Sequence, residues 1–218
     1  MNTINEILKQ AAPSVTSETI AKYAPYLADL MPKYGIDTPL RQRHFLAQIL
    51  HESGGFSTVR EKMNYSENGL LTTFGAYYSK NGGEKAVLQN PTKTIVKRKA
   101  LDDAYKPQVI GNWVYANRMG NGNDDGYKNR GVGLIQSTGA FNIRNVSLCI
   151  FGDDRALKNP EILEQPQYAA ESACWFWKAN NLNALADKDD LVAVTRRING
   201  GINGIEDRKK YYDRLKLA

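Results

Sequence analysis

Cysteine and histidine are scarce in this chain, with two residues of each among 218. Cys149 and Cys174 are too few for a disulfide framework, and two buried thiols are the expected state. His44 and His51 are too few for most zinc sites made of protein ligands alone. A zinc-protease motif would need a second histidine four residues after His51, where Gly55 stands. The sequence therefore predicts neither a metal nor a cofactor.

Long apolar runs are also absent. No stretch approaches the roughly 18 apolar residues that a membrane span requires. The first 25 residues contain Glu6, Lys9, Gln10 and Glu18, which interrupt any apolar core of a secretory signal. We therefore expect synthesis in the cytoplasm and no stable insertion into a membrane.

Positive charge is concentrated in the middle of the chain. The net charge is +6, and residues 75–130 hold ten basic and five acidic side chains, which accounts for +5 of it. Such a segment attracts polyanions, among them nucleic acid, anionic lipid and cell-wall polymer. The run Lys97-Arg98-Lys99 has no interleaved aromatic residues and no recognisable nucleic-acid-binding motif, so nucleic acid is not the expected partner.

Helical spacing of apolar residues dominates the rest of the sequence. Thr3 and Glu6 form a capping-box pattern at the start of the first helix, and no strand-length alternation of apolar and polar residues stands out. The glycine- and asparagine-rich stretch 120–133 predicts functional loops, and 75–107 predicts short helices and loops. The fold class is therefore expected to be all-α, with further helices over 17–31, 39–51, 160–181, 191–198 and 207–217.

The predicted helix at 39–51 places a carboxylate in an unusual position. Phe45, Ile49 and Glu52 share one face at i, i+4 and i+7, so Glu52 is expected beside buried apolar side chains. Gly54 and Gly55 follow and end the helix. An apolar setting favours the protonated acid, which is the form that donates a proton to a leaving group.

A second carboxylate follows nine residues later. Glu61 lies between Arg60 and Lys62, whose charges favour its ionised form. Two carboxyl groups in contrasting environments suit the hydrolysis of a glycosidic bond, in which one acts as acid and the other as base or nucleophile. Spacing alone is weak evidence, because two glutamates nine residues apart are common.

Four sequence blocks add specificity to this pair. They are His51-Glu52-Ser53-Gly54-Gly55-Phe56 with Glu61 and Asn64-Tyr65-Ser66, then Tyr115-Ala116-Asn117-Arg118-Met119-Gly120-Asn121-Gly122, then Arg130-Gly131-Val132-Gly133-Leu134-Ile135-Gln136-Ser137-Thr138-Gly139, and finally Arg197-Ile198-Asn199-Gly200-Gly201-Ile202-Asn203-Gly204. In content and order, over residues 45–208, they resemble glycoside hydrolase family 19, the chitinase-like family that includes many bacteriophage endolysins.

The resemblance implies a lysozyme-like fold of two lobes with a catalytic cleft between them. The whole chain, 1–218, would form a single catalytic domain, with a larger lobe of about 1–75 and 140–218 and a smaller basic lobe of about 76–139. By position in the family pattern, Glu52 would be the general acid and Glu61 the general base, and Thr138 would help to hold the attacking water. The same pattern places Gln136, Asn142 and Asn199 at sugar-binding positions and Arg208 in a charged network near the acid.

The third block departs from the family pattern Arg-Gly-Arg-Gly-Leu-Ile-Gln-Leu-Thr-Gly at two positions. Val132 replaces the second arginine, and Ser137 replaces the leucine. These changes affect the expected sugar contacts but leave the acid and base in place. The segment 83–107 is longer and more basic than is typical of the family, so the resemblance assigns it no role.

Several alternatives remain open at this point. A lytic transglycosylase also uses a glutamate in a Glu-Ser-Gly context but needs no second base. A non-enzymatic protein could act on walls or membranes through its basic segment and the 208–216 helix.

Asn121 to Gly126 resembles half of a calcium loop, but Val132 stands where the bidentate glutamate belongs. Trp175 and Trp177 are expected in the core, and the role of Trp113 stays open.

The hypothesis that combines these features is a monomeric, phage-type endolysin. It would hydrolyse, with inversion, the β-1,4 bond between N-acetylmuramic acid and N-acetylglucosamine in peptidoglycan strands. Chitin is the alternative substrate. The resemblance further implies synthesis in a host cytoplasm and holin-assisted release toward the cell wall in the periplasm.

Overall fold

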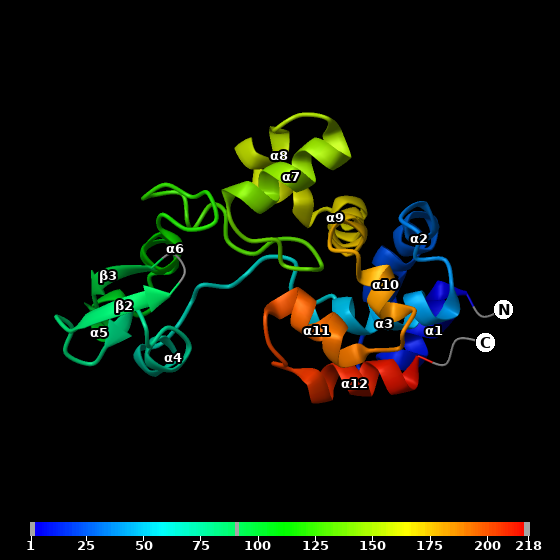
Figure 1. Ribbon diagram of the computed structural model, residues 1–218, viewed down its shortest axis with the longest axis horizontal. Helices are drawn as coiled ribbons and strands as arrows, with labels where there is room; N and C mark the ends of the chain where they lie inside the picture. Colours follow the sequence, from blue (N-terminus) through cyan, green and yellow to red (C-terminus); the bar gives the residue numbers. More distant parts are fainter. Residues whose placement is uncertain (1–2, 90–91, 216–218) are drawn as a thin grey trace. The chain divides into compact units, whose positions relative to one another are not determined.

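The computed structural model describes residues 3–89 and 92–215, and helices account for most of them (Figure 1). The chain divides into two compact units. The first holds residues 3–60, 132–137 and 146–215, and the second holds 61–89, 92–131 and 138–145. Residues 61–75, predicted to belong to the larger lobe, are part of the second unit. The grouping of both units into one catalytic domain stays a prediction.

The first unit is made of helices. In chain order they are α1 (Ile4–Ala11), α2 (Ser17–Lys33), α3 (Pro39–Glu52), α8 (Arg155–Lys158), the 3₁₀ helix η1 (Pro160–Glu164), α9 (Pro166–Ala179), α10 (Leu182–Ala186), α11 (Leu191–Asn199) and α12 (Ile205–Arg214). Helix α7 (Ala140–Phe151) has its first residues in the second unit and its last in the first. The all-α prediction is confirmed, and among the described helices none is long and apolar enough to cross a bilayer.

Helix α3 runs through the middle of the first unit. The Thr38 hydroxyl caps its start by accepting a hydrogen bond from the Arg41 N–H, and Pro39 occupies the first turn, where no intrahelical donor is needed. The helix ends at Glu52, one residue beyond the predicted range. Gly54 and Gly55 then adopt φ values of 54° and 68°, left-handed angles that glycine reaches without steric cost.

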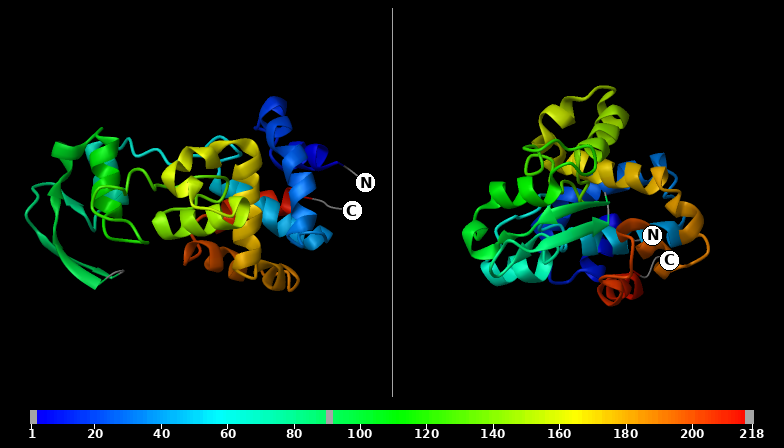
Figure 2. Two further views of the ribbon diagram at one scale, coloured as in Figure 1. Left: turned by 90° about the horizontal axis from the view of Figure 1, so that it is seen from above. Right: turned by 60° about the vertical axis from the view of Figure 1, so that its left-hand side comes forward.

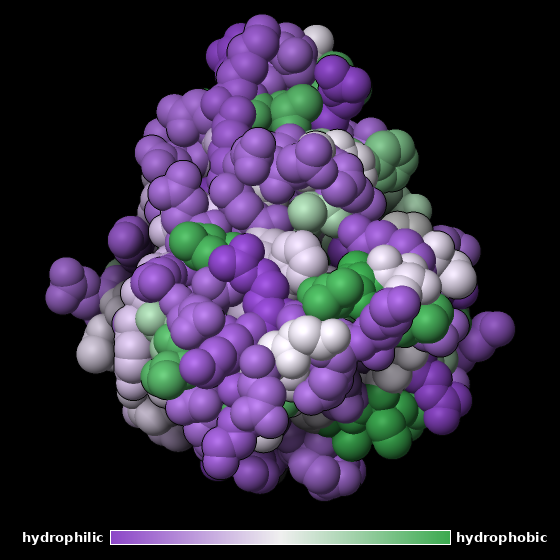
Figure 3. Space-filling view, turned by 90° about the vertical axis from the view of Figure 1, so that its left-hand side faces the viewer, coloured by the Kyte–Doolittle hydropathy of each residue, from purple (hydrophilic) through white to green (hydrophobic). Residues whose placement is uncertain are grey.

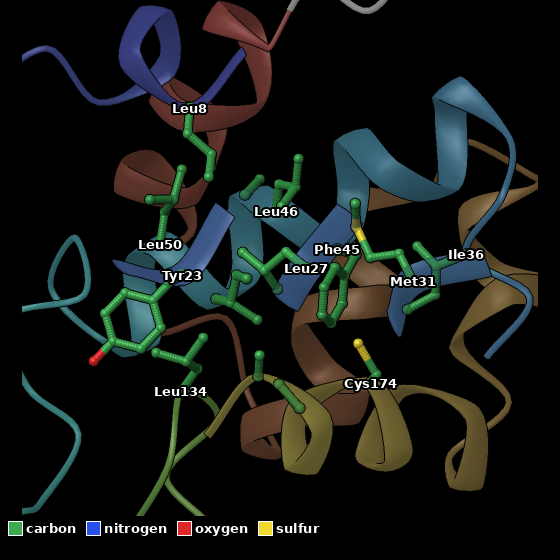
Figure 4. Close-up of a cluster of buried hydrophobic side chains, with 14 of the residues drawn as sticks. Leu8, Tyr23, Leu27, Met31, Ile36, Phe45, Leu46, Leu50, Leu134 and Cys174 are labelled. Atoms are coloured by element: carbon green, nitrogen blue, oxygen red, sulfur yellow. The ribbon is translucent and has the colours of Figure 1, made fainter. Parts of the chain in front are cut away.

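The core of the first unit surrounds this helix. Leu27 and Met31 of α2 and Phe45 and Leu46 of α3 are buried, and Figure 4 shows them gathered with Leu134 and Cys174. Burying a side chain of this size stabilises the fold by about 1.5–3 kcal/mol. Because so many of the residues of α3 lie in this core, the position of Glu52 at its end is firmly fixed.

The second unit has a separate, smaller core. Its regular elements are α4 (Glu67–Thr73), β1 (Tyr78–Ser79), β2 (Lys85–Gln89), β3 (Thr92–Val96), β4 (Arg98–Lys99), α5 (Ala100–Asp103) and α6 (Pro107–Tyr115). Leu70, Tyr78, Ile110 and Val114 are among its buried side chains. The molecular face seen in Figure 3 is mainly hydrophilic, with apolar residues in small, separate groups.

An antiparallel hairpin within this unit contradicts the prediction of only helices and loops over 75–107. Strand β2 pairs with β3 (Figure 2). In the register of this pair, Lys85 stands opposite Val96. Val87 and Val96 are 59% and 53% exposed, while Leu88 on the other face is buried. Because apolar residues occupy both faces, the period-2 alternation that marks a half-buried strand is lost from the sequence.

One of the two cysteines differs from its prediction. Cys174 is buried in α9 as expected, but Cys149 of α7 is exposed, and both are free thiols.

Trp177 is buried as predicted, whereas Trp175 is only partly buried. Helix α12, expected as a surface helix over 207–217, instead buries Arg208 and Tyr212. Residues 216 and 217 of the predicted segment lie outside the described residues.

Candidate active site

Glu52 ends α3 beside a buried cation. Its Oε1 lies 2.5 Å from Nη2 of Arg208, which is on α12, 156 residues away in sequence. The Arg208 side chain is 2% exposed and that of Glu52 is 19% exposed. The apolar setting predicted for Glu52 is therefore only part of its environment, because a desolvated guanidinium is its nearest partner. A pair this deeply buried fixes the orientation of the carboxylate.

Arg208 is itself held by residues that the sequence did not single out. Its Nη1 donates to Gln48 Oε1, and its Nε donates to the Asn203 carbonyl at 3.4 Å. Gln48 Nε2 in turn donates to the Thr195 hydroxyl at 3.2 Å, and both of these side chains are fully buried. A polar network thus joins α3, α11 and α12 behind Glu52. The sequence feature that could have indicated the role of Gln48 is its position on α3, one helical turn before Glu52.

His51 joins the same two helices on the surface. Its Nδ1 lies 2.7 Å from Asp207 Oδ2, at the start of α12. Gly204 packs so closely on the imidazole that a β-carbon there would lie 2.3 Å from the ring. The role that the structure supports for His51 is to hold the start of α12, and with it Arg208, against the end of α3.

Glu61 belongs to the second unit and has a different set of partners. The Tyr115 hydroxyl donates to both carboxylate oxygens at 2.8 and 3.1 Å, and the Gly131 N–H donates to Oε2 at 3.1 Å. The Glu61 N–H donates to the Gly131 carbonyl at 2.8 Å, and Arg130 Nε donates to the Glu61 carbonyl at 2.9 Å. Five hydrogen bonds with neighbouring segments thus fix both the backbone and the carboxylate.

The cations predicted beside Glu61 are not its partners. Arg60 lies in the first unit, where its Nε is 3.7 Å from Glu164, and Lys62 is exposed. Neutral donors hold the Glu61 carboxylate instead. Burial, reinforced by the charge of Glu61, raises the pKa of Tyr115 well above its ordinary value, so its hydroxyl stays protonated and donating at neutral pH.

Thr138 and Asn142 also lie in the second unit and contact each other. Asn142 Nδ2 donates to the Thr138 carbonyl at 2.8 Å, across the first turn of α7. Asn121 of the supposed calcium half-loop has a structural role, since its Oδ1 accepts from Asn129 Nδ2 and from the Ala140 N–H. Among the described residues, no group of three histidine, cysteine, aspartate or glutamate side chains could hold a metal ion.

Gln136 lies in a loop of the first unit, and Asn199 is the last residue of α11, before the loop that leads to α12. Gln136 has a φ of 54°, and its Nε2 donates to the carbonyls of Thr58 and Gly133 at 3.3 and 2.9 Å. Asn199 is exposed, donates to the Asn203 carbonyl at 3.0 Å and accepts from the Gly201 N–H at 2.9 Å. Both amides order their own loops, and their sugar-binding roles stay predictions.

The departure at Val132 has a structural explanation, whereas nothing in the structure explains the serine at 137. Val132 is fully buried and Ser137 is buried, and their backbones pair in antiparallel fashion, with N–H to carbonyl distances of 3.1 and 2.9 Å. A buried arginine in place of Val132 would need a partner for its charge. These residues therefore close the loop that carries Gln136.

Comparison with known proteins finds relatives by sequence and by structure. A "Glycosyl hydrolase family 19 domain-containing protein" of Haemophilus influenzae strain Rd is 35% identical over 219 residues, which covers 99% of this chain and 94% of the relative. No family model matches the chain.

Solved structures show the same fold at lower identity. Chitinase C from Streptomyces griseus HUT6037 superposes with a TM-score of 0.58 at 19% identity, over 98% of this chain and 74% of that one. A bacterial family 19 chitinase gives a TM-score of 0.58 at 17% identity, over 99% and 96% of the two chains. A class IV chitinase from Zea mays gives 0.50 at 19% identity, over 99% and 91%. The predicted fold class is confirmed by these matches.

The family follows from the sequence relative, whose identity extends over almost the full length of both chains. The chain belongs to glycoside hydrolase family 19 and is a glycosidase with a helical, lysozyme-like fold.

Proposed function

We propose that this glycosidase is an endolysin-like muramidase that hydrolyses the β-1,4 bond between N-acetylmuramic acid and N-acetylglucosamine in peptidoglycan. The observation that carries the proposal is that each of its two carboxylates is held in place by donors from other segments. Glu52 is paired with a buried guanidinium, whereas neutral phenol and amide donors hold Glu61. Two carboxyl groups fixed in this way can act as the positioned acid and base of one reaction.

In the proposed mechanism, Glu52 donates a proton to the leaving oxygen of the glycosidic bond, and Glu61 accepts a proton from the attacking water. Arg208 and Gln48 hold the acid in one rotamer, and Tyr115 and Gly131 hold the base. Thr138 is proposed to help position the water, and Gln136, Asn142 and Asn199 to bind the sugars. Inversion follows if the water attacks directly, without a glycosyl-enzyme intermediate.

The choice of peptidoglycan over chitin depends on charge. The segment 75–130 carries a net charge of +5. Lys80, Lys85, Lys93, Lys99 and Lys106 form no ion pair with any described residue. Peptidoglycan carries carboxylates on its peptides, whereas chitin is neutral, so a cationic surface favours peptidoglycan. The structural relatives named above are chitinases, which makes chitin the second candidate substrate.

The test is the identity of the ends released from each polymer. Purified peptidoglycan and chitin are digested in parallel, reduced to mark new reducing ends, and analysed by mass spectrometry. The proposal predicts reduced N-acetylmuramic acid at the new ends of peptidoglycan fragments. Soluble products from chitin alone would make chitin the substrate instead of peptidoglycan. Anhydro ends would indicate a lytic transglycosylase, and free peptides would contradict cleavage of a glycosidic bond.

Substitution of the proposed base gives a second check. Glu61→Gln is expected to lower turnover of peptidoglycan about 10²-fold, because the amide cannot accept the proton of the water. Initial rates of release of reducing ends measure the effect. Glu67→Gln removes a nearby carboxylate at the start of α4 and is expected to leave the rate unchanged. Equal rates for Glu61→Gln and this control would remove Glu61 from the mechanism.

The Tyr115 hydroxyl is expected to matter through Glu61. Tyr115→Phe removes the donor to both carboxylate oxygens while keeping the ring in the core of the second unit. Loss of one hydrogen bond to a charged group should lower turnover about tenfold. The change should fall on kcat and shift the acidic side of the pH profile, which reports protonation of the base. A purely structural role would lower thermal stability with the pH profile unchanged.

A further inference from the structure

A cavity of about 410 Å³ lies within the second unit, apart from the residues assigned to catalysis. Its lining includes Lys93 of β3, Trp113 of α6 and Asp124 of the loop that follows α6. Three amide side chains also line it, Asn112, Asn117 and Asn123. All of these residues belong to one compact unit, so the cavity is a feature of that unit by itself.

The cavity and Glu61 lie on opposite sides of α6. Trp113 lines the cavity, and Tyr115, two residues further on, binds Glu61. Successive residues of an α-helix are rotated by about 100°, so these two side chains project about 200° apart. A ligand in this cavity would therefore occupy a site separate from the proposed base.

The amides of the cavity are fixed and still have hydrogen-bonding capacity. Asn117 Nδ2 donates to Asn123 Oδ1 at 2.7 Å, which leaves the Asn117 carbonyl oxygen and the Asn123 amino group for a ligand. Asn112 Oδ1 accepts from the Tyr127 N–H at 2.8 Å, which leaves its amino group. Trp113 Nε1 donates to the Tyr77 carbonyl at 3.3 Å, so the indole is anchored with part of its ring exposed. The cavity thus offers donors, acceptors and an aromatic surface.

One charge of each sign completes the lining. Lys93 and Asp124 form no ion pair with any described residue, although Lys93 Nζ lies 3.4 Å from the Ala116 carbonyl. The third charged side chain, Arg98, is held by the buried Asp103 at 2.6 and 2.8 Å, which compensates its charge. The ligand complementary to this arrangement carries a carboxylate, an ammonium group and amide bonds.

We propose that this cavity binds the peptide that peptidoglycan strands carry on N-acetylmuramic acid. Such peptides combine amide bonds and free carboxylates with an amino group on the third residue, whereas an N-acetylglucosamine polymer has neither charge. The cavity thereby selects the peptide-substituted polymer over chitin. This inference rests on the proposed function and adds to it a site for recognition of the substrate.

Binding is tested with a muramyl tripeptide whose third residue has a free amino group. The probe contains no bond between two sugars, so wild-type enzyme cannot hydrolyse it. Titration of ¹⁵N-labelled protein should shift the indole N–H signal of Trp113 and the side-chain amide signals of Asn112, Asn117 and Asn123. Diacetylchitobiose at the same concentrations should leave these signals in place.

Two charge variants and one matched control define the contribution of the cavity. Lys93→Gln and Asp124→Asn should each weaken binding of the tripeptide about fivefold, the effect of one partly exposed ionic contact. Lys85→Gln removes the same charge from the exposed face of the same hairpin and should leave the affinity unchanged. Equal weakening by Lys85→Gln and Lys93→Gln would reduce the effect to general charge attraction and overturn the proposal.

The results separate this inference from the proposed function. The enzyme could release N-acetylmuramic acid ends from peptidoglycan while the tripeptide leaves the NMR signals of the cavity residues in place. That result would overturn the inference and leave the proposed function standing. Tripeptide binding by a protein that releases products from chitin alone would overturn the proposed function and support the cavity as a peptide site. Equal shifts with diacetylchitobiose would make the cavity a site for neutral sugars and contradict the inference.

Discussion

Glu52→Gln is expected to lower the rate of glycan hydrolysis by about 10²- to 10⁴-fold, the usual contribution of a positioned proton donor. Glutamine is close in shape but has no acidic proton to transfer to the leaving oxygen. Initial rates on peptidoglycan, followed as new reducing ends, measure the loss. Glu206→Gln changes an exposed carboxylate on α12 and serves as the matched control, with the rate expected to stay at the wild-type level.

The structure also revises what this substitution does to stability. For a glutamate without a buried partner, replacement by glutamine would leave the fold almost unaffected. The ion pair with Arg208 changes that expectation, because a buried guanidinium would keep only a neutral acceptor at this position. The free energy of unfolding should fall by about 1–3 kcal/mol. A folded variant with an unchanged hydrolysis rate would remove Glu52 from the mechanism.

Arg208→Met is expected to lower the free energy of unfolding by about 3–5 kcal/mol, the usual cost of removing one member of a buried ion pair. Methionine fills much of the volume but leaves the Glu52 carboxylate without its cation and Gln48 Oε1 without its donor. Urea unfolding followed by circular dichroism measures the change. Activity, measured at a temperature where the variant is folded, should fall as well, because Glu52 loses the contact that orients it.

Lys210→Met is the control for this prediction. Lys210 is exposed on the same helix and forms no ion pair among the described residues, so its substitution should change stability by less than about 0.5 kcal/mol. The free energy of unfolding of Arg208→Lys should lie between those of the two variants. A lysine retains the charge but not the forked guanidinium geometry that reaches both Glu52 and Gln48. If Arg208→Met were as stable as Lys210→Met, the network would have no structural role.

Local signals in the sequence predict much of the first unit. The cap at Thr38, the proline that follows and the paired glycines after Glu52 define α3 from both ends, and the structure ends that helix at Glu52. The apolar spacing of Phe45 and Ile49 correctly predicts its buried face. Features of this kind are readable because cause and effect lie within one or two helical turns.

The partners of the two carboxylates are beyond the reach of such signals. Arg208 lies 156 residues from Glu52, and Tyr115 lies 54 residues from Glu61. Family resemblance supplied Arg208 and included Tyr115 in one of its blocks without a role, and neither spacing nor resemblance supplied Gln48. Neighbours in sequence were the only available guide for Glu61, and they were misleading, because Arg60 pairs with Glu164 instead.

The hairpin of the second unit was missed for a different reason. Strands β2 and β3 have five residues each, and exposed Val87 and Val96 put apolar residues on the outer face. Such short segments carry too few residues to establish a period, and their pairing depends on the whole unit. Cys149 is a similar case, since its exposure depends on which face of α7 is covered.

The most direct test of the central claim is the configuration of the sugar released in the first turnovers. Hydrolysis of a soluble β-1,4-linked oligosaccharide substrate is followed by proton NMR before the anomers equilibrate. If Glu52 is the acid and Glu61 activates water, the new reducing end appears first as the α-anomer. A β-anomer at the earliest times would mean retention through an intermediate, and it would contradict the assignment of Glu61 as the general base.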